Sequence, residues 1–119
     1  MSKVDSFKQL DAWAVALDLA AAVYQLTNDF PRSEQFGLTG QMRRASVSIP
    51  SNIAEGHRRT RPAYVNHLQI ALGSLAELET QLILARRLQF CRQEQSEPVV
   101  RLVEATGKLL HALLRSLRE

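Results

Sequence analysis

The chain has 119 residues, of which 45% are hydrophobic and 23% charged, and this composition is typical of one globular domain covering residues 1–119. No apolar run is longer than six residues, the length of Leu19–Tyr24, whereas a membrane-spanning helix needs about 20. The first residues lack the apolar core of a signal peptide. We therefore expect a cytoplasmic protein without membrane contact. The net charge of +3 is modest, and the single cysteine, Cys91, excludes an internal disulfide.

The first periodic segment covers residues 6–28. Ser6 followed by Gln9 matches a capping box, and Pro31 marks the stop. The apolar residues fall on two adjacent helix faces, one with Leu10, Trp13, Leu17, Ala20 and Tyr24, and the other with Ala12, Ala16, Leu19, Val23 and Leu26. So wide an apolar arc has more surface to bury than one seam. It predicts either self-association or a tightly filled core.

The second segment covers residues 33–55, with a single apolar face. The residues of this face are Leu38, Met42, Ala45, Ile49 and Ile53. Pro50 removes a backbone donor and disfavours helix at the preceding residue, so we expect a kink there or a fresh helix start capped by Ser48. Gly56 is expected to end this helix.

The third segment begins at Thr60, a good N-cap, with Pro62 in the first turn. It has the most regular periodicity in the chain. Its apolar stripe is Leu68, Ala71, Leu75, Leu78, Leu82 and Ala85. Gly73, in the middle of the segment, is expected to mark close packing against another helix.

The fourth segment runs from about Ser96 to the end, after a polar connection over residues 89–97. Its expected stripe is Val99, Leu102, Thr106, Leu109, Leu113 and Leu117, with Val103, Leu110 and Leu114 beside it. Four amphipathic helices with short connections predict an all-α, antiparallel up-and-down four-helix bundle. The first and fourth helices look too apolar for a monomer, and this favours self-association through them.

The motifs of an enzyme are missing from the sequence. There is no Glu-x-x-His pair for a di-metal site, no phosphate-binding glycine loop and no nucleophile elbow. The histidines at 57, 67 and 111 and Cys91 do not have the spacing of zinc ligands. We therefore expect no catalytic activity, metal, cofactor or small-molecule substrate. A hydrolase built on Glu55 and His57 is the least favoured alternative.

Arginine is frequent, with 12 arginines against three lysines, and its guanidinium matches phosphate as a bidentate fork. Basic residues concentrate between Glu34 and Glu77, where Glu55 is the only acid. The candidate nucleic-acid-binding residues are Arg43, Arg44, Ser48, Asn52, Arg58, Arg59 and Arg61. The arginines would neutralise phosphates, and the short polar side chains would fix the position of the strand. Tyr64, next to the arginines in the sequence, is expected to stack on a base.

The same residues have a purely structural interpretation. Serine hydroxyls can bond the backbone carbonyls that Pro50 leaves without a partner. Asn52 and Glu55 can anchor Arg43 or Arg44 across the bundle. The arginines of the following turn complement the dipole at a helix C-terminus whatever the function. A solvated basic face is therefore an open alternative to a nucleic-acid surface.

Several short strings of the sequence together match a family pattern. They are Leu10–Trp13, Phe30–Pro31, Phe36–Thr39, Gln41–Ala45, Ser48–Gly56 and Ala71–Glu79. With them the chain resembles, over nearly its whole length, the four-helix-bundle proteins encoded within intervening sequences of bacterial 23S ribosomal RNA genes. The Ser48–Gly56 string, Ser-Ile-Pro-Ser-Asn-Ile-Ala-Glu-Gly, is its most specific part.

This resemblance implies an antiparallel bundle that assembles as a ring-shaped homopentamer. A more distant similarity, to the accessory variability protein of diversity-generating retroelements, implies a basic pentamer that binds nucleic acid. The residues on the family's polar motif are Arg43, Arg44, Asn52 and Glu55, and Pro50 and Gly56 belong to the same string. The run Ala14–Ala16 departs from the pattern, because it makes the first helix more apolar.

We therefore predict a non-enzymatic oligomer, a pentamer by resemblance, that binds RNA or DNA through an arginine-rich polar surface. The alternative is a protein-interaction or scaffold module whose apolar faces hold a partner chain. In that case Arg43 and Arg44 would bond inside the bundle.

Overall fold

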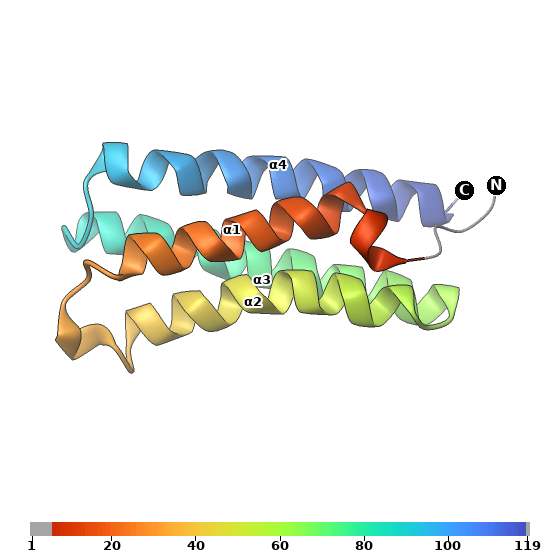
Figure 1. Ribbon diagram of the computed structural model, residues 1–119, viewed down its shortest axis with the longest axis horizontal. Coiled ribbons are helices and arrows are strands. Elements are labelled where there is room, and N and C mark those ends of the chain that lie inside the picture. The colour runs from red at the N-terminus through yellow and green to blue at the C-terminus, as the bar shows by residue number, and fades with distance from the viewer. Residues whose placement is uncertain (1–5, 119) are drawn as a thin grey trace.

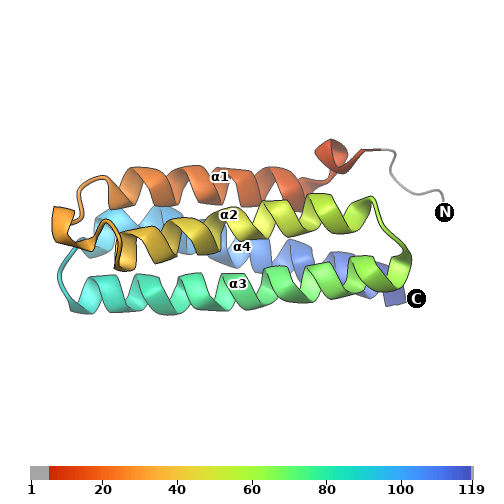
Figure 2. The ribbon, with the colours of Figure 1, turned by 90° about the horizontal axis from the view of Figure 1, so that it is seen from below.

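The computed structural model describes residues 6–118, and its principal extents are 47 × 24 × 20 Å. The elements are the 3-10 helices η1 (Phe7–Gln9) and η2 (Arg32–Glu34) and the helices α1 (Asp11–Thr27), α2 (Leu38–His57), α3 (Arg61–Arg87) and α4 (Gln93–Arg118). The four α-helices run antiparallel in chain order around one core, as Figures 1 and 2 show. The predicted all-α four-helix bundle is confirmed.

Each helix packs against two neighbours, α1 against α2 and α4, and α3 against the same two helices. The α2–α3 contact is the most extensive of the four. Because alternate helices reverse direction, the end of α2, the start of α3, the end of α4 and η1 all lie at the same end of the molecule (Figure 1). This topology decides which charged side chains meet.

The helix starts follow local capping chemistry. Ser6 accepts a hydrogen bond from the backbone N–H of Lys8 at 3.2 Å and so caps η1, while α1 begins separately at Asp11. The predicted capping box with Gln9 is therefore wrong. Thr60 caps α3 as predicted, accepting from Ala63 N at 3.4 Å.

The fourth helix begins earlier than predicted, at Gln93. Gln95 Oε1 reaches back to the backbone N–H of Arg92 at 2.7 Å, which is the returning half of a capping box. Pro98 therefore lies inside α4, and Ser96 is buried there, with its hydroxyl donating to Gln93 O at 2.9 Å.

Pro50 does not start a new helix, because α2 continues through it to His57. Ile49 and Ile53, on either side of the proline, have no exposed surface. Burial of two large side chains outweighs one missing backbone hydrogen bond. The expectation of a fresh start capped by Ser48 is wrong.

The core contains the predicted stripes of α2 and α3, whose members are all buried. On α1 the core comes mainly from the second predicted face, and on α4 it combines members of the predicted stripe with the residues beside it. Ala12, Ala16, Leu19 and Val23 are buried on α1, and Val99, Val103, Thr106, Leu110 and Leu114 on α4. On the other face of α1, Leu17 and Tyr24 are 47% and 43% exposed. Of the remaining members of that face, Ala20 is buried and Leu10 and Trp13 pack against the core, so only part of the face is left at the surface of the bundle.

The two interior glycines have the opposite of their predicted roles. Gly56 lies buried inside α2 rather than after its end, and an added Cβ would lie 2.7 Å from His67 Cβ and 3.1 Å from Tyr64 Cδ1 on α3. Gly73 is exposed, and an added Cβ would meet nothing within 4 Å. The close helix approach is therefore at Gly56.

Replacing Gly56 with alanine should lower the free energy of unfolding by about 1–3 kcal/mol, because α2 and α3 must separate to admit the methyl group. Urea denaturation measures this change. The matched control, Gly73→Ala, should raise stability by about 1 kcal/mol through helix propensity alone. A Gly56→Ala chain as stable as the parent would contradict the close approach.

Candidate nucleic-acid interface

Arg43 is directed at the C-terminus of α1 rather than into open solvent. Its Nε donates to Thr27 Oγ1 at 2.9 Å, and its Nη2 donates to Asn28 Oδ1 at 3.2 Å and to Tyr24 O at 3.4 Å. The guanidinium also lies 4.6 Å from the centre of the Tyr24 ring. A cation here bonds one carbonyl group and two side chains at the end of α1 and complements the helix dipole. Arg43 therefore has a clear structural role.

Arg44, the next residue, is exposed. Its Nη1 would lie only 3.3 Å from a Cβ added at Gly40, one turn earlier, so the guanidinium folds back over this glycine. It lines two hollows, one shared with Tyr24 and Val47 and the other with residues of α3. Within residues 6–118 it forms no ion pair.

Ser48 and Asn52 belong to a hydrogen-bonded chain that joins α2 to α3. Ser48 Oγ lies 2.9 Å from Ser74 Oγ, and Asn52 Nδ2 donates to Ser48 Oγ at 3.0 Å and to Ser48 O at 2.8 Å. Asn52 Oδ1 lies 2.9 Å from Nδ1 of His67. Since Asn52 uses its amide hydrogens on Ser48, His67 Nδ1 is the donor in this last bond. The side-chain amide of Asn52 thus has internal partners for both its NH2 group and its carbonyl oxygen.

The turn between α2 and α3 carries Arg58 and Arg59, and Arg61 is the first residue of α3; all three are exposed. Arg58 lies over the Phe7 ring, 5.4 Å from its centre, and Arg59 Nη2 pairs with Glu55 Oε1 at 2.9 Å. The Arg59–Glu55 pair is more than half exposed on both sides. Such a pair is readily exchanged for an outside anion, because exposed ion pairs contribute little free energy.

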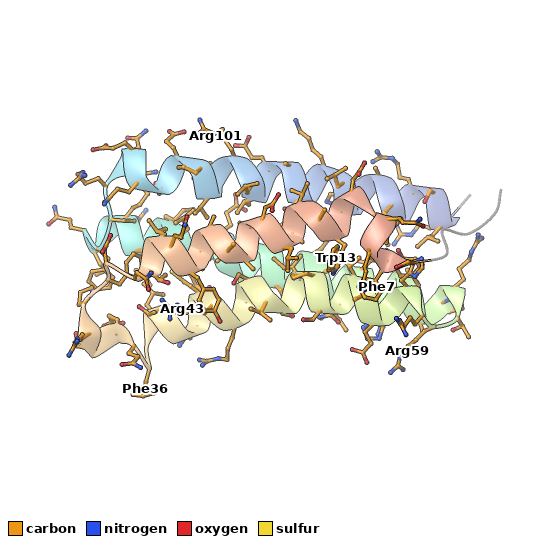
Figure 3. The ribbon with its side chains drawn as sticks, in the orientation of Figure 1. Phe7, Trp13, Phe36, Arg43, Arg59 and Arg101 are labelled. Atoms are coloured by element: carbon orange, nitrogen blue, oxygen red, sulfur yellow. The ribbon has the colours of Figure 1, made fainter. Side chains whose placement is uncertain are left out.

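The fold adds basic residues to this turn that lie far away in the sequence. The C-terminal turn of α4 and the helix η1 come to the same end of the bundle, where Figure 3 shows Arg59. We define the basic end as the exposed residues Lys8, Arg58, Arg59, Arg61, Arg115 and Arg118. Among the described residues, Asp11 and Glu55 are the acids at this end. The antiparallel topology was the signal that would have predicted this grouping.

The arginines do not form one continuous surface. About 14 helical residues separate Arg44 from Arg58, a distance of about 21 Å along the helix. Figure 3 places Arg43 toward the end of the bundle near Phe36 and Arg59 at the opposite end. The predicted polar line along α2 is therefore interrupted, because Ser48 and Asn52 in its middle face α3.

Tyr64 is not available to stack on a base, because it is only 4% exposed. Its ring packs edge-on against His57, with the ring centres 5.7 Å apart. Burial raises the pKa of Tyr64 to about 12, and its hydroxyl has no hydrogen-bond partner within the described chain. The predicted stacking role of Tyr64 is therefore wrong.

No group of three or more His, Cys, Asp or Glu side chains within residues 6–118 is arranged to hold a metal ion. Cys91 is buried; burial raises the pKa of its thiol, and the charge of Arg86 partly opposes this.

Within residues 6–118, no helix is long and apolar enough to span a membrane.

Replacing Arg43 with methionine should lower the free energy of unfolding by about 1–3 kcal/mol, because the end of α1 loses its hydrogen-bond donors. Arg44→Met is the matched control and should change stability by less than about 0.5 kcal/mol. Urea denaturation of both variants decides the point. Equal effects would show that Arg43 does not hold α1 in place.

Stability should also depend on Tyr64 at high pH. An unfolded tyrosine loses its proton near pH 10, whereas the folded chain keeps the Tyr64 proton because the pKa is raised to about 12. The contribution of Tyr64 to the free energy of unfolding is therefore fully present below about pH 10 and is lost as the pH rises toward about 12. Tyr64→Phe should reduce this loss and be nearly neutral at pH 7, as denaturation across the pH range would measure. If the variant lost stability at high pH as steeply as the parent chain, Tyr64 would not be the cause of the loss.

Comparison with known proteins identifies the family. The family model described as 23S rRNA-intervening sequence protein matches residues 8–112. Among solved structures, the chain is similar to a protein with unknown function from the S23 ribosomal protein family of Bacteroides thetaiotaomicron. The two sequences are 26% identical, and the match covers 87% of this chain and 95% of that chain with a TM-score of 0.80. A search of curated proteins gave no match. The chain belongs to the 23S rRNA-intervening sequence protein family.

Proposed function

We propose that the protein is a non-enzymatic, oligomeric nucleic-acid-binding protein that contacts phosphates through its basic end. The observation that carries this proposal is the gathering of six exposed basic side chains from η1, the α2–α3 turn, the start of α3 and the end of α4. Two acids among the described residues of that end leave it positive. Five of the six cations are arginines, which bind phosphate oxygens through two parallel hydrogen bonds.

This proposal modifies the role of the residues predicted from the sequence. Arg58, Arg59 and Arg61 provide the phosphate contacts, while Arg43, Ser48 and Asn52 hold the helices together. The absence of catalysis is part of the proposal. Burial raises the pKa of the Cys91 thiol, which disfavours the thiolate that a cysteine nucleophile needs.

The proposed assembly is a homo-oligomer, with five subunits as the family resemblance implies. Large apolar side chains remain exposed on α1 and α3, including Leu17 at 47%, Ile70 at 44%, Ile83 at 52% and Leu84 at 45%. Within the described chain, α4 has no exposed large apolar side chain of this kind. We therefore assign the subunit contacts to the outer faces of α1 and α3 rather than to the first and fourth helices. Repeating the basic end in each subunit would strengthen binding to a polyanion.

A scaffold module is the second candidate, and the same apolar faces favour it. A protein partner on α1 and α3 would bury the exposed residues without using the basic end. The two candidates differ in which substitutions matter, so they are separable by variants at the basic end.

Binding to labelled single-stranded RNA, measured by fluorescence anisotropy, should weaken steeply between about 50 mM and about 200 mM salt, because each neutralised phosphate releases counterions. Replacing Arg58, Arg59 and Arg61 together with serine should weaken binding at least about tenfold. The matched control replaces three exposed arginines at the other end, Arg32, Arg86 and Arg87, and should have a much smaller effect. Equal losses would indicate an effect of net charge alone, and no binding at low salt would contradict the proposal.

Light scattering after size exclusion tests the assembly. Ile83→Glu combined with Leu84→Glu should lower the measured mass, because charges would be buried between subunits. Ala112→Glu, on the exposed side of α4, is the control and should leave the mass unchanged. A monomeric parent chain, or disruption by the α4 variant alone, would contradict the assigned interface.

A further inference from the structure

A polar cleft of about 240 Å³ opens on the side of the bundle between α2 and α3. Its lining residues are Gln41, Arg44, Ala45, Ser48, Ser74, Glu77 and Gln81. All but the alanine are polar, although a seam between two packed helices is normally apolar. Sites for drug-sized molecules measure about 300–1,000 Å³, so this cleft suits a smaller group, such as a single heterocyclic ring system.

A pair of serine hydroxyls lies in the cleft. Ser48 Oγ and Ser74 Oγ are 2.9 Å apart, and Ser48 Oγ also accepts from Asn52 Nδ2 at 3.0 Å. Two hydroxyls carry two hydrogens, and the bond between them uses only one. The other hydrogen is therefore available to an acceptor atom of a ligand.

Opposite charges face each other across the cleft. Because α2 and α3 run antiparallel and Ser48 meets Ser74, the turn before Ser48 lies level with the turn after Ser74, which brings Arg44 opposite Glu77. Within residues 6–118 neither side chain forms an ion pair, and both are exposed. One wall thus offers a guanidinium fork and the other a carboxylate.

Two glutamine amides complete the lining, and each is both a donor and an acceptor. Gln81 Oε1 is buried without a hydrogen-bond partner in the described chain. Buried polar atoms are normally paired. This oxygen is therefore shielded from water beside the cleft, and it has a free acceptor for a ligand that enters there.

We propose that this cleft binds one unpaired guanine of a nucleic-acid strand. The inference rests on the proposed function and adds the base that the protein selects. Guanine has two acceptors on one edge, O6 and N7, which match the Arg44 fork. It has two donors on another edge, the N1–H and the N2 amino group, which match the Glu77 carboxylate. Adenine, cytosine and uracil each lack at least one of these two pairs.

The strand must be single-stranded or looped at this position. Watson–Crick pairing would occupy N1 and N2 of guanine, so only an unstacked, unpaired base presents both edges at once. Arg44 thus reads the base, while the arginines of the basic end contact phosphates.

Anisotropy with the full chain and labelled single-stranded RNA at about 50 mM salt tests this proposal. An adenine strand with isolated guanines should bind at least about tenfold more tightly than an all-adenine strand, because a bidentate contact to a base discriminates by about that factor. Inosine, which lacks the N2 amino group, and 7-deazaguanine, which lacks the N7 acceptor, should each remove most of the advantage when they replace guanine.

Two variants assign the contacts to their atoms. Glu77→Gln should reduce the preference for guanine over inosine, and Arg44→Lys should reduce the preference for guanine over 7-deazaguanine, because lysine keeps the charge but not the fork. Glu79→Gln and Arg87→Lys are the matched controls, since both residues are exposed on α3 outside the cleft lining. Both controls should retain both preferences.

The outcomes separate this inference from the function on which it rests. Salt-dependent binding that does not distinguish guanine from adenine overturns the guanine site and leaves the nucleic-acid function in place. If neither strand binds, the proposed function fails, and guanosine 5′-monophosphate alone then tests the cleft. Amide NMR shifts at Ser48, Ser74 and Glu77 would support a guanine site there, and their absence at millimolar nucleotide would overturn it.

Discussion

The close approach of α2 and α3 at Gly56 is the constraint on which the other features depend. With no side chain at Gly56, the backbone of α2 comes within contact of His67 and Tyr64 on α3. This approach brings Asn52 within hydrogen-bond distance of His67, and further along the seam Ser48 meets Ser74. A slip of one helix along the other would break these bonds together, so the polar chain sets the register of the two helices as well as their spacing.

This register distributes the arginines of α2 among different tasks. Arg43 turns toward α1 and bonds the Tyr24 carbonyl and two side chains at the end of that helix, whereas Arg44 reaches a polar cleft beside Ser48 and Ser74. Within residues 6–118, the internal partners of the arginines beyond the end of α2 are the exposed Glu55 and the Phe7 ring. One stretch of basic sequence therefore contains a structural residue, a cleft residue and a charged surface.

The accuracy of the sequence interpretation varied with how distinctive each apolar pattern was. On α3 a single regular stripe was flanked by polar residues, and that stripe is the core. On α1 and α4 two adjacent faces were apolar, and periodicity cannot tell which of them faces the bundle. The buried face of α1 was the one with Ala12, Ala16, Leu19 and Val23, and on α4 the buried residues came from both predicted rows, because the neighbouring helices, not the helix itself, decide what fits.

The roles of the special residues were harder to predict. Local propensity alone predicts that Pro50 interrupts the helix. In the structure α2 is continuous through Pro50, because Ile49 and Ile53 on either side are buried. Gly56 and Gly73 are equivalent in a local pattern, and only the position of α3 makes one of them a contact and leaves the other in open space. The basic end was not predicted, because residues 8, 58 and 118 are distant in the sequence and only the packing of the helices brings them to one end.

The amino-acid sequence by itself determined the all-α bundle, the number of long helices, the antiparallel order and the core of α2 and α3. These follow from periodicity, capping residues and short connections, all of which act over a few neighbouring residues. The tertiary structure alone decided which arginines bond inward, which glycine is a contact and which charges share one end. Those properties depend on how helices distant in sequence approach and align, and no local pattern encodes that geometry.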